Sequence, residues 1–293
     1  MHRHGRRGGV KTAALMGLLS AFVLVAGRAA GGSAGFVVAL VVALAMNAVG
    51  YFCSDRLALR SMRAVPVSEI QAPRLYAIVA ELARAYRVPM PRLYLSPTAA
   101  PNAFATGRDP RHAAVCVTRG LLELLDEREL RGVLGHELAH VANRDILISS
   151  VAGGLASVIV WLAGMARWAA IFGAGRDDGE SGGFLGALLL IVLGPIAATL
   201  VQLAIGRSRE YDADTTGAEV TGDPLALASA LHKLAAGTAA RPLVPSAELA
   251  PTSALMIANP FGGSPLMALF STHPPLGERV ARLEEMVDRL VVS

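Results

Sequence analysis

The sequence predicts a mainly α-helical membrane protein with four transmembrane helices and a cytoplasmic α+β domain. Of its 293 residues, 53% are hydrophobic and only 17% are charged, whereas soluble domains carry about 25% charged residues. Four long stretches are almost free of charge, and arginines gather beside one set of their ends. The segments between and after these stretches show helical and strand periodicity.

The composition also excludes several classes of protein. A disordered chain, a collagen-like repeat and a disulfide scaffold are excluded, the last because the chain has only two cysteines, Cys53 and Cys116. The net charge is +4 and the isoelectric point about 9.4. The basic residues nevertheless lie beside apolar segments rather than along a helical stripe with aromatics. We therefore expect a lipid bilayer and no nucleic acid as a partner.

Four apolar stretches are predicted to span the membrane, at residues 12–28, 33–53, 146–166 and 183–205. A span needs roughly 20 apolar residues with a lower limit of about 17, so the first stretch is marginal and the others qualify. Buried core helices are the alternative, which the length and lack of charge disfavour. The first stretch also fits a signal peptide, because basic residues precede a short apolar run. Whether or not the first stretch is cleaved as a signal peptide, the second stretch ends on the cytoplasmic side.

Positive charge sets the predicted orientation, because loops rich in Lys and Arg stay in the cytoplasm. On one side of the spans lie Arg3, Arg6, Arg7, Lys11, Arg56, Arg60, Arg63, Arg144, Arg207 and Arg209. The opposite side holds only Arg28, Arg167 and Arg176. We expect a multi-pass protein of the cell membrane with both termini in the cytoplasm. The predicted units are a transmembrane hairpin (1–53), a cytoplasmic part (54–145), a second hairpin (146–206) and a cytoplasmic part (207–293).

The first cytoplasmic part predicts a helix, three strands and a second helix. An amphipathic helix opens at Pro73, and short strands follow at 92–96, 102–107 and 112–118, separated by Pro and Gly. Cys116 is expected to be a buried strand residue with a free thiol. Asp126 and Glu129 form a capping-box pattern, which predicts a helix that starts near Glu127 and runs into the third span.

The second cytoplasmic part predicts three helices and a long loop. We expect a helix from Arg207 that continues from the fourth span, a helix capped by Asp223 and Pro224, a Pro- and Gly-rich loop over 239–275, and a closing amphipathic helix from Leu276. No internal repeat is visible in the sequence.

The motif His136-Glu137-Leu138-Ala139-His140 carries the chemistry. On a helix, His136 and His140 lie one turn apart and can bind one Zn²⁺ together. Glu137 is placed to act as general base toward a water molecule. Val133 shares the same stripe, which favours a cleft over a solvated face. The alternative is a solvated helix whose histidines bind nothing.

Glu210 is the candidate for a third ligand, since catalytic zinc takes three protein ligands and a water. The histidine pair lies just before the third predicted span, and Glu210 lies just after the fourth. Two spans return the chain to the membrane face it left, so Glu210 and the histidines lie on the same side. Asp214, one turn further, suits an outer role in which it accepts the free N–H of a ligating histidine. A solvated acidic face matched to Arg207 and Arg209 is the alternative.

These motifs resemble the HtpX family of membrane-bound zinc metalloproteases, gluzincins related to the CAAX prenyl endoproteases, in its actinobacterial form. The resemblance covers nearly the whole chain and includes HELAH before an apolar hairpin, R-x-R-E-Y-x-A-D after it, AAPNAFATGRDPRHAAVCVT, LMIANPF and STHPP. Gly206 departs from the Ser that many relatives carry. The resemblance implies a zincin-like metalloprotease domain with one Zn²⁺ held by His136, His140 and Glu210, and Glu137 as the catalytic glutamate.

The resemblance also implies an inner-membrane endopeptidase of protein quality control and stress response, whose site faces the cytoplasm. Its substrates would be misfolded or damaged membrane proteins or unfolded proteins. Two alternatives stay open: a CAAX-type protease acting on prenylated tails, and a proteolytically silent scaffold with a structural zinc. Relatives of the first kind have more spans, and the second has no need of Glu137 as a base.

Two lesser motifs belong to the same resemblance. Asn102, in Asn-Ala-Phe-Ala, resembles the start of an edge strand beside the cleft that could pair with an extended substrate; an ordinary strand is the alternative. His273, in Ser-Thr-His-Pro-Pro, resembles an element near the active site that could stabilise an oxyanion. A plain loop histidine is the alternative there, with Arg279 as a structural partner of that loop.

Overall fold

The computed structural model describes residues 2–156, 206–244, 246, 249–261 and 274–292. The second half of the predicted third span and all of the fourth lie outside the described residues, and so does His273. The described part of the third span, Ile146–Ala156, is an apolar helix. The four-span organisation therefore stays a prediction.

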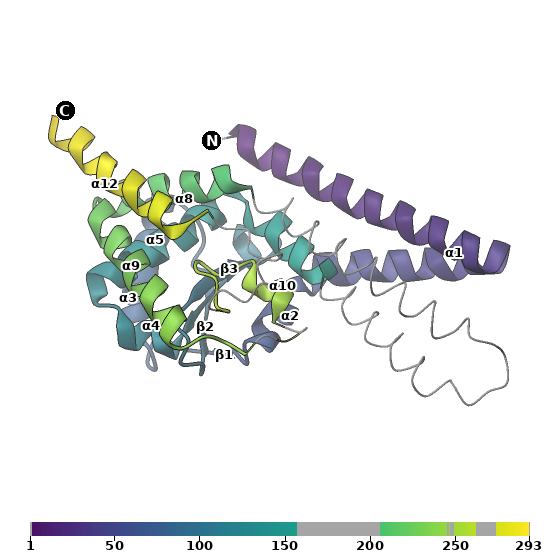
Figure 1. Cartoon of the computed structure of the whole chain (residues 1–293), viewed down its shortest axis with the longest axis horizontal. Helices are drawn as coiled ribbons and strands as arrows, with labels where there is room; N and C mark the ends of the chain where they lie inside the picture. Colours follow the sequence, from purple (N-terminus) through teal and green to yellow (C-terminus); the bar gives the residue numbers. More distant parts are fainter. Residues whose placement is uncertain (1, 157–205, 245, 247–248, 262–273, 293) are drawn as a thin grey trace.

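The chain begins with α1 (His2–Phe52), which folds back on itself at the end farthest from the sheet (Figure 1). Gly32 has a φ of 59°, a left-handed conformation that glycine adopts without strain. Across the hairpin, Asn47 Nδ2 donates a hydrogen bond of 2.8 Å to Ser20 Oγ. Among the described residues, Gly32–Phe52 is the helix long and apolar enough to cross a membrane, and Thr12–Val25 is a shorter apolar helix. The reversal falls between the two predicted N-terminal spans.

A four-stranded sheet in the order β1-β2-β4-β3 supports the site. Its strands are β1 (Val65–Pro66), β2 (Arg92–Ser96), β3 (Ala103–Thr106) and β4 (Ala114–Thr118). β2 and β4 are parallel, and the other two pairs are antiparallel. The three predicted strands are confirmed, the first with its predicted bounds and the other two with shorter ones. The last strand starts later than predicted because a 3₁₀ turn (Pro110–His112) precedes it. Cys116 is fully buried on β4, as expected.

Helices cover the sheet and form most of the structure. They are α2 (Ser54–Ser61), α3 (Pro73–Tyr86), α4 (Arg119–Leu124), α5 (Glu127–Asn143), α8 (Arg207–Thr221), α9 (Pro224–Ala240), α10 (Ala250–Ser253) and α12 (Leu276–Val292). α5 is central and packs against α3, α8, α9 and β3 (Figure 1). One hydrophobic core joins these helices to the inner face of the sheet.

Small residues allow α5 and α8 to cross closely. A Cβ atom on Gly217 would lie 2.9 Å from the backbone nitrogen of His136, and one on Gly135 would lie 2.8 Å from Thr221 Cγ2. Larger side chains at these glycines would push the helices apart. The crossing therefore brings the start of α8 against the face of α5 that carries the histidines.

The capping box at the start of α5 is confirmed. Asp126 Oδ1 accepts a hydrogen bond of 2.8 Å from the N–H of Glu129, and Glu129 Oε2 accepts one of 3.1 Å from the N–H of Asp126. Both bonds satisfy N–H groups that a helix start leaves without a partner. The Asp223 cap of α9 is confirmed in the same way, by a bond from Ala226 N–H.

The expectation that α5 runs straight into the third span is wrong. α5 ends at Asn143, and Arg144 adopts a left-handed conformation with a φ of 60°. The N–H of Asp145 then bonds the carbonyl of His140 over 3.0 Å, a bond that closes the end of a helix. A new helical stretch starts at Ile146.

The expectation that α8 continues from the fourth span is also wrong. Gly206 is extended, with φ −72° and ψ 134°, and serves as the N-cap residue, so α8 starts at Arg207. α5 is thus separated by a bend at Arg144 from the apolar helix that starts at Ile146, and α8 starts directly after an extended residue.

Candidate metal centre

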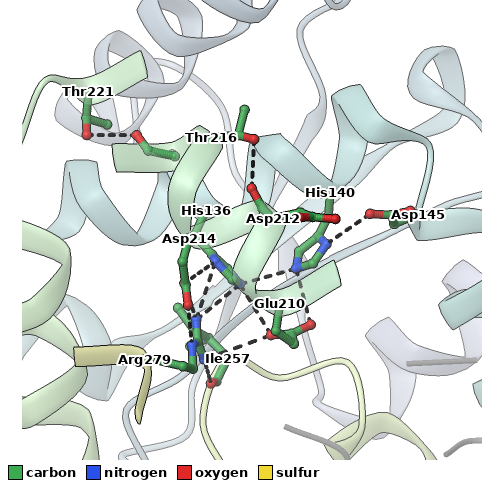
Figure 2. A network of polar contacts seen from close by, with 12 residues as sticks. His136, His140, Asp145, Glu210, Asp212, Asp214, Thr216, Thr221, Ile257 and Arg279 are labelled. Atoms are coloured by element: carbon green, nitrogen blue, oxygen red, sulfur yellow. Dashed lines mark hydrogen bonds and ion pairs between the residues drawn. The ribbon is translucent and has the colours of Figure 1, made fainter. Parts of the chain in front are cut away.

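Three side chains from α5 and α8 converge at one point (Figure 2). His136 Nε2 and His140 Nε2 lie 3.2 Å apart. Glu210 reaches both rings, with Oε2 3.7 Å from His136 Nε2 and Oε1 3.5 Å from His140 Nε2. All the candidate ligand atoms lie within 4.8 Å of one another. Within the part of the chain that the structure describes, this is the group that could hold a metal ion.

The donor set fits a divalent metal such as zinc. Two imidazole nitrogens and a carboxylate oxygen are a common ligand set of catalytic zinc sites. The side chains of His136 and Glu210 are 1% and 3% exposed, and that of His140 is 16% exposed. A carboxylate buried this deeply is costly without a nearby cation. The more exposed side of His140 leaves an approach for a water or a substrate.

Asp214 lies behind His136, on the side away from the converging atoms (Figure 2). His136 Nδ1 lies 2.9 Å from Asp214 Oδ1. This contact favours the tautomer that carries a proton on Nδ1 and leaves the Nε2 lone pair directed at the cluster. Burial opposes ionisation of Asp214, but the charge and hydrogen bonds of Arg279 hold the pKa of its carboxyl below the usual value.

Arg279 reaches this group from α12. Its Nε and Nη2 donate hydrogen bonds of 2.8 and 2.7 Å to the two oxygens of Asp214, and its Nη1 donates one of 3.0 Å to the carbonyl of Ile257. From the sequence, Arg279 is expected only as a structural partner of the loop that carries His273. A signal was available, because Arg279 lies on the apolar stripe of its helix with Leu276, Val280 and Leu283.

The two histidines have opposite electrostatic environments. Burial and the charge of Arg279 lower the pKa of His136 to about 4. Burial also disfavours the charged form of His140, but Asp145, Glu210 and Glu137 raise its pKa to about 9. Asp145 Oδ2 lies 3.8 Å from His140 Nδ1, and the bend at the end of α5 places it there. Metal binding at His140 would therefore release a proton near neutral pH.

Glu137 lines a small cavity beside the histidines. The cavity has a volume of about 20 Å³, and its walls include Ala105, His140, Asp145 and Glu210, which leaves room for about one water molecule. Burial raises the pKa of Glu137 to about 7, although a hydrogen bond from the backbone of Ala105 opposes the shift. A carboxyl group with a pKa near neutrality is suited to both accepting and releasing a proton.

The structure places Asn102 outside this cluster. Its buried side chain donates a hydrogen bond of 2.8 Å to the carbonyl of Ala258 and accepts one of 3.3 Å from the N–H of the same residue. The N–H of Ile257 bonds the carbonyl of Ala103 over 3.0 Å. Residues 257–258 thus run along the outer edge of β3 at its start, while Ala105 at its other end lines the cavity. The substrate roles of Asn102 and His273 stay predictions.

Comparisons with known proteins place the chain in a family. The model of Peptidase family M48 matches residues 69–287. A protease HtpX homolog of Kineococcus radiotolerans is 56% identical over 98% of both chains, and one of Paenarthrobacter aurescens is 53% identical over 99% of both. The crystal structure of Ste24p from S. mikatae has a TM-score of 0.47 at 15% identity, over 97% of this chain and 67% of that one. The chain therefore belongs to peptidase family M48, beside the protease HtpX homologues, and is a membrane-associated metalloprotease.

Proposed function

We propose that this protein is a zinc-dependent endopeptidase that cleaves misfolded or damaged membrane proteins at the cytoplasmic face of the cell membrane. One Zn²⁺ per chain would be held by His136, His140 and Glu210. The observation that carries the proposal is that their ligand atoms converge within 4.8 Å beside the small cavity that Glu137 lines. A structural zinc site would not need an acid group at that place.

In the proposed hydrolysis, the metal and Glu137 have separate roles. Zn²⁺, when bound, supplies a Lewis acid that polarises the scissile carbonyl and lowers the pKa of a water molecule. Glu137 accepts the proton that this water loses on attack and then delivers it to the leaving amine nitrogen. Burial raises the pKa of the Glu137 carboxyl, which favours its role as a proton acceptor. The hydrogen bond from the Ala105 backbone holds its carboxylate toward the cavity.

We propose that β3 binds the substrate backbone. β3 is an edge strand, and extended peptides commonly add to such an edge through main-chain hydrogen bonds. The carbonyl of Ala103 accepts the N–H of Ile257, so we expect a substrate to pair at the other end of β3, where Ala105 lines the cavity. Pairing there would bring a peptide bond to the cavity that Glu137 lines.

The membrane setting supports the choice of substrate class. α1 reverses at Gly32, and its second arm is long and apolar enough to cross a bilayer. The arginines that follow it favour a cytoplasmic catalytic domain. Segments of membrane proteins that emerge into the cytoplasm would be within reach of a site on that side.

Metal removal tests the proposal. The full-length protein is purified in detergent, and its zinc content and hydrolysis of casein are measured before and after treatment with a chelator. We expect hydrolysis to disappear with the zinc and to return when Zn²⁺ is added back. Hydrolysis that persists in the metal-free protein would contradict the proposal.

A further inference from the structure

Arg279 is a charged residue where an apolar one is expected. It lies on the inner face of α12 between Leu276 and Leu283, and its exposed fraction is 0%. It is the largest fully buried side chain among the described residues. A buried charge is unfavourable unless it is fully paired, so a guanidinium at this place requires an explanation.

The polar contacts of Arg279 with described residues lead to the candidate metal centre or its surroundings (Figure 2). Nε and Nη2 donate hydrogen bonds of 2.8 and 2.7 Å to the two oxygens of Asp214, and Nη1 donates one to the carbonyl of Ile257. This two-pronged geometry matches the planar fork of arginine, which a lysine cannot reproduce. Because two bonds fix the plane of the carboxylate, they also fix where Asp214 Oδ1 points.

Asp214 Oδ1 is the oxygen that faces His136. It lies 2.7 Å from Arg279 Nη2 and 2.9 Å from His136 Nδ1. The ring orientation and tautomer of His136 therefore depend on a carboxylate that Arg279 holds in place. Arg279 does not line the cavity beside Glu137, so it is not placed to touch a substrate.

We propose that Arg279 is a positioning residue for the metal. By clamping Asp214, it keeps His136 Nε2 directed toward His140 and Glu210 and thereby sets the zinc affinity of the site. The proposal rests on the zinc-binding function proposed above. Arg279 is not needed to pack α12 against the domain, because Val280 and Leu283 of the same helix are already buried in the main hydrophobic core.

The test compares three full-length variants purified in detergent. Arg279→Ala removes the clamp, Arg279→Lys keeps the charge without the fork, and Leu283→Ala removes buried packing from the same helix without touching Asp214. Zinc affinity is measured by competition with a chromophoric chelator, and the melting temperature is measured in parallel.

We expect Arg279→Ala to lower zinc affinity by roughly 10- to 100-fold, the usual effect of losing a partner behind a metal ligand. Arg279→Lys should recover part of this loss. Leu283→Ala should lower the melting temperature and leave zinc affinity close to that of the wild type. Should Arg279→Ala fail to fold, the comparison of Arg279→Lys with Leu283→Ala decides.

The proposal is overturned if folded Arg279→Ala or Arg279→Lys binds zinc as tightly as the wild type, or if Leu283→Ala weakens binding as much as Arg279→Ala does. Failure of the proposed function would give a different result. The wild-type protein itself would then either bind no zinc or hydrolyse casein in the absence of zinc.

Discussion

At the residue scale, Glu210 and Asp214 contact the histidines from different sides although they lie one turn apart on α8. The two oxygens of Glu210 each lie near the Nε2 atom of a different histidine. Asp214 approaches His136 from behind, at Nδ1, and is held there by Arg279. Glu210 is therefore placed to bind the metal, and Asp214 to orient a ligand.

Replacing these two residues should separate the two roles. Glu210→Ala should purify essentially free of zinc, because the site loses a ligand. Asp214→Asn should still bind zinc under saturating metal, with an affinity roughly 10- to 100-fold lower. Elemental analysis and chelator competition on the full-length protein provide the measurement. Asp212→Asn, an exposed neighbour on α8, is the matched control. The opposite pattern would assign the ligand role to Asp214.

The sequence allowed part of the site to be predicted. His136, Glu137 and His140 are fixed by local helix geometry, and Glu210 by the need to return to the same membrane face. The clamp of Arg279 could not be predicted in the same way. Its partners, Asp214 and Ile257, lie 65 and 22 residues away in the chain, and only the packing of α12 brings them together.

At the element scale, local patterns predicted the helices and strands better than the points where they end. The capping box of α5 and the strands β2 to β4 depend on neighbouring residues, and they are confirmed. The bends at Arg144 and Gly206 were missed, because an apolar pattern continues close to them. β1 has only two residues, one of them a proline, and is held by pairing with β2. Such a short strand has no periodicity to detect.

The start of α5 should be sensitive to acid through Glu129. The side chain of Glu129 is 5% exposed, and it accepts hydrogen bonds from Lys233 and Ser229. Burial alone would raise its pKa, but these bonds lower it below the usual value. A carboxyl group whose pKa is lowered by folding stabilises the folded protein at pH values above its unfolded-state pKa, which is about 4.3 for Glu. This stabilisation is lost as the pH falls through the folded-state pKa.

Glu129→Gln should therefore reduce stability at neutral pH by about 1–3 kcal/mol. The difference from the wild type should shrink as the pH falls below the unfolded pKa of about 4.3 and then through the lower folded-state pKa. Thermal unfolding in detergent at several pH values measures the effect. Glu127→Gln, at an exposed position of the same turn, is the control. A difference that stays constant with pH would contradict the assignment.

At the scale of the whole molecule, the metal centre joins two parts of the chain that an apolar segment separates. His136 and His140 precede residues 146–206, and Glu210 follows them. Ligands from both parts can meet on one face of a membrane only if the intervening chain crosses it an even number of times. The meeting of these ligands is compatible with the predicted hairpin of two spans, which stays a prediction.

The predicted topology can be measured with reporter fusions. Fusions after Cys53, at Asp177 and at Ser293 should report cytoplasm, outside and cytoplasm in that order, because basic residues flank the first and third positions. A cytoplasmic signal at Asp177 would rule out the second hairpin. An external signal at Ser293 would place Glu210 on the wrong side of the membrane.

The proposed mechanism requires that Glu137 acts on the water and does not hold the metal. Zinc content and casein hydrolysis of the full-length protein in detergent, compared between the wild type and Glu137→Gln, test it most directly, with the exposed substitution Glu127→Gln as control. We expect zinc to be retained in all three proteins and hydrolysis to fall by at least about 100-fold in Glu137→Gln only, the usual effect of losing a general base. Loss of zinc from Glu137→Gln, or hydrolysis at the wild-type rate, would contradict the account.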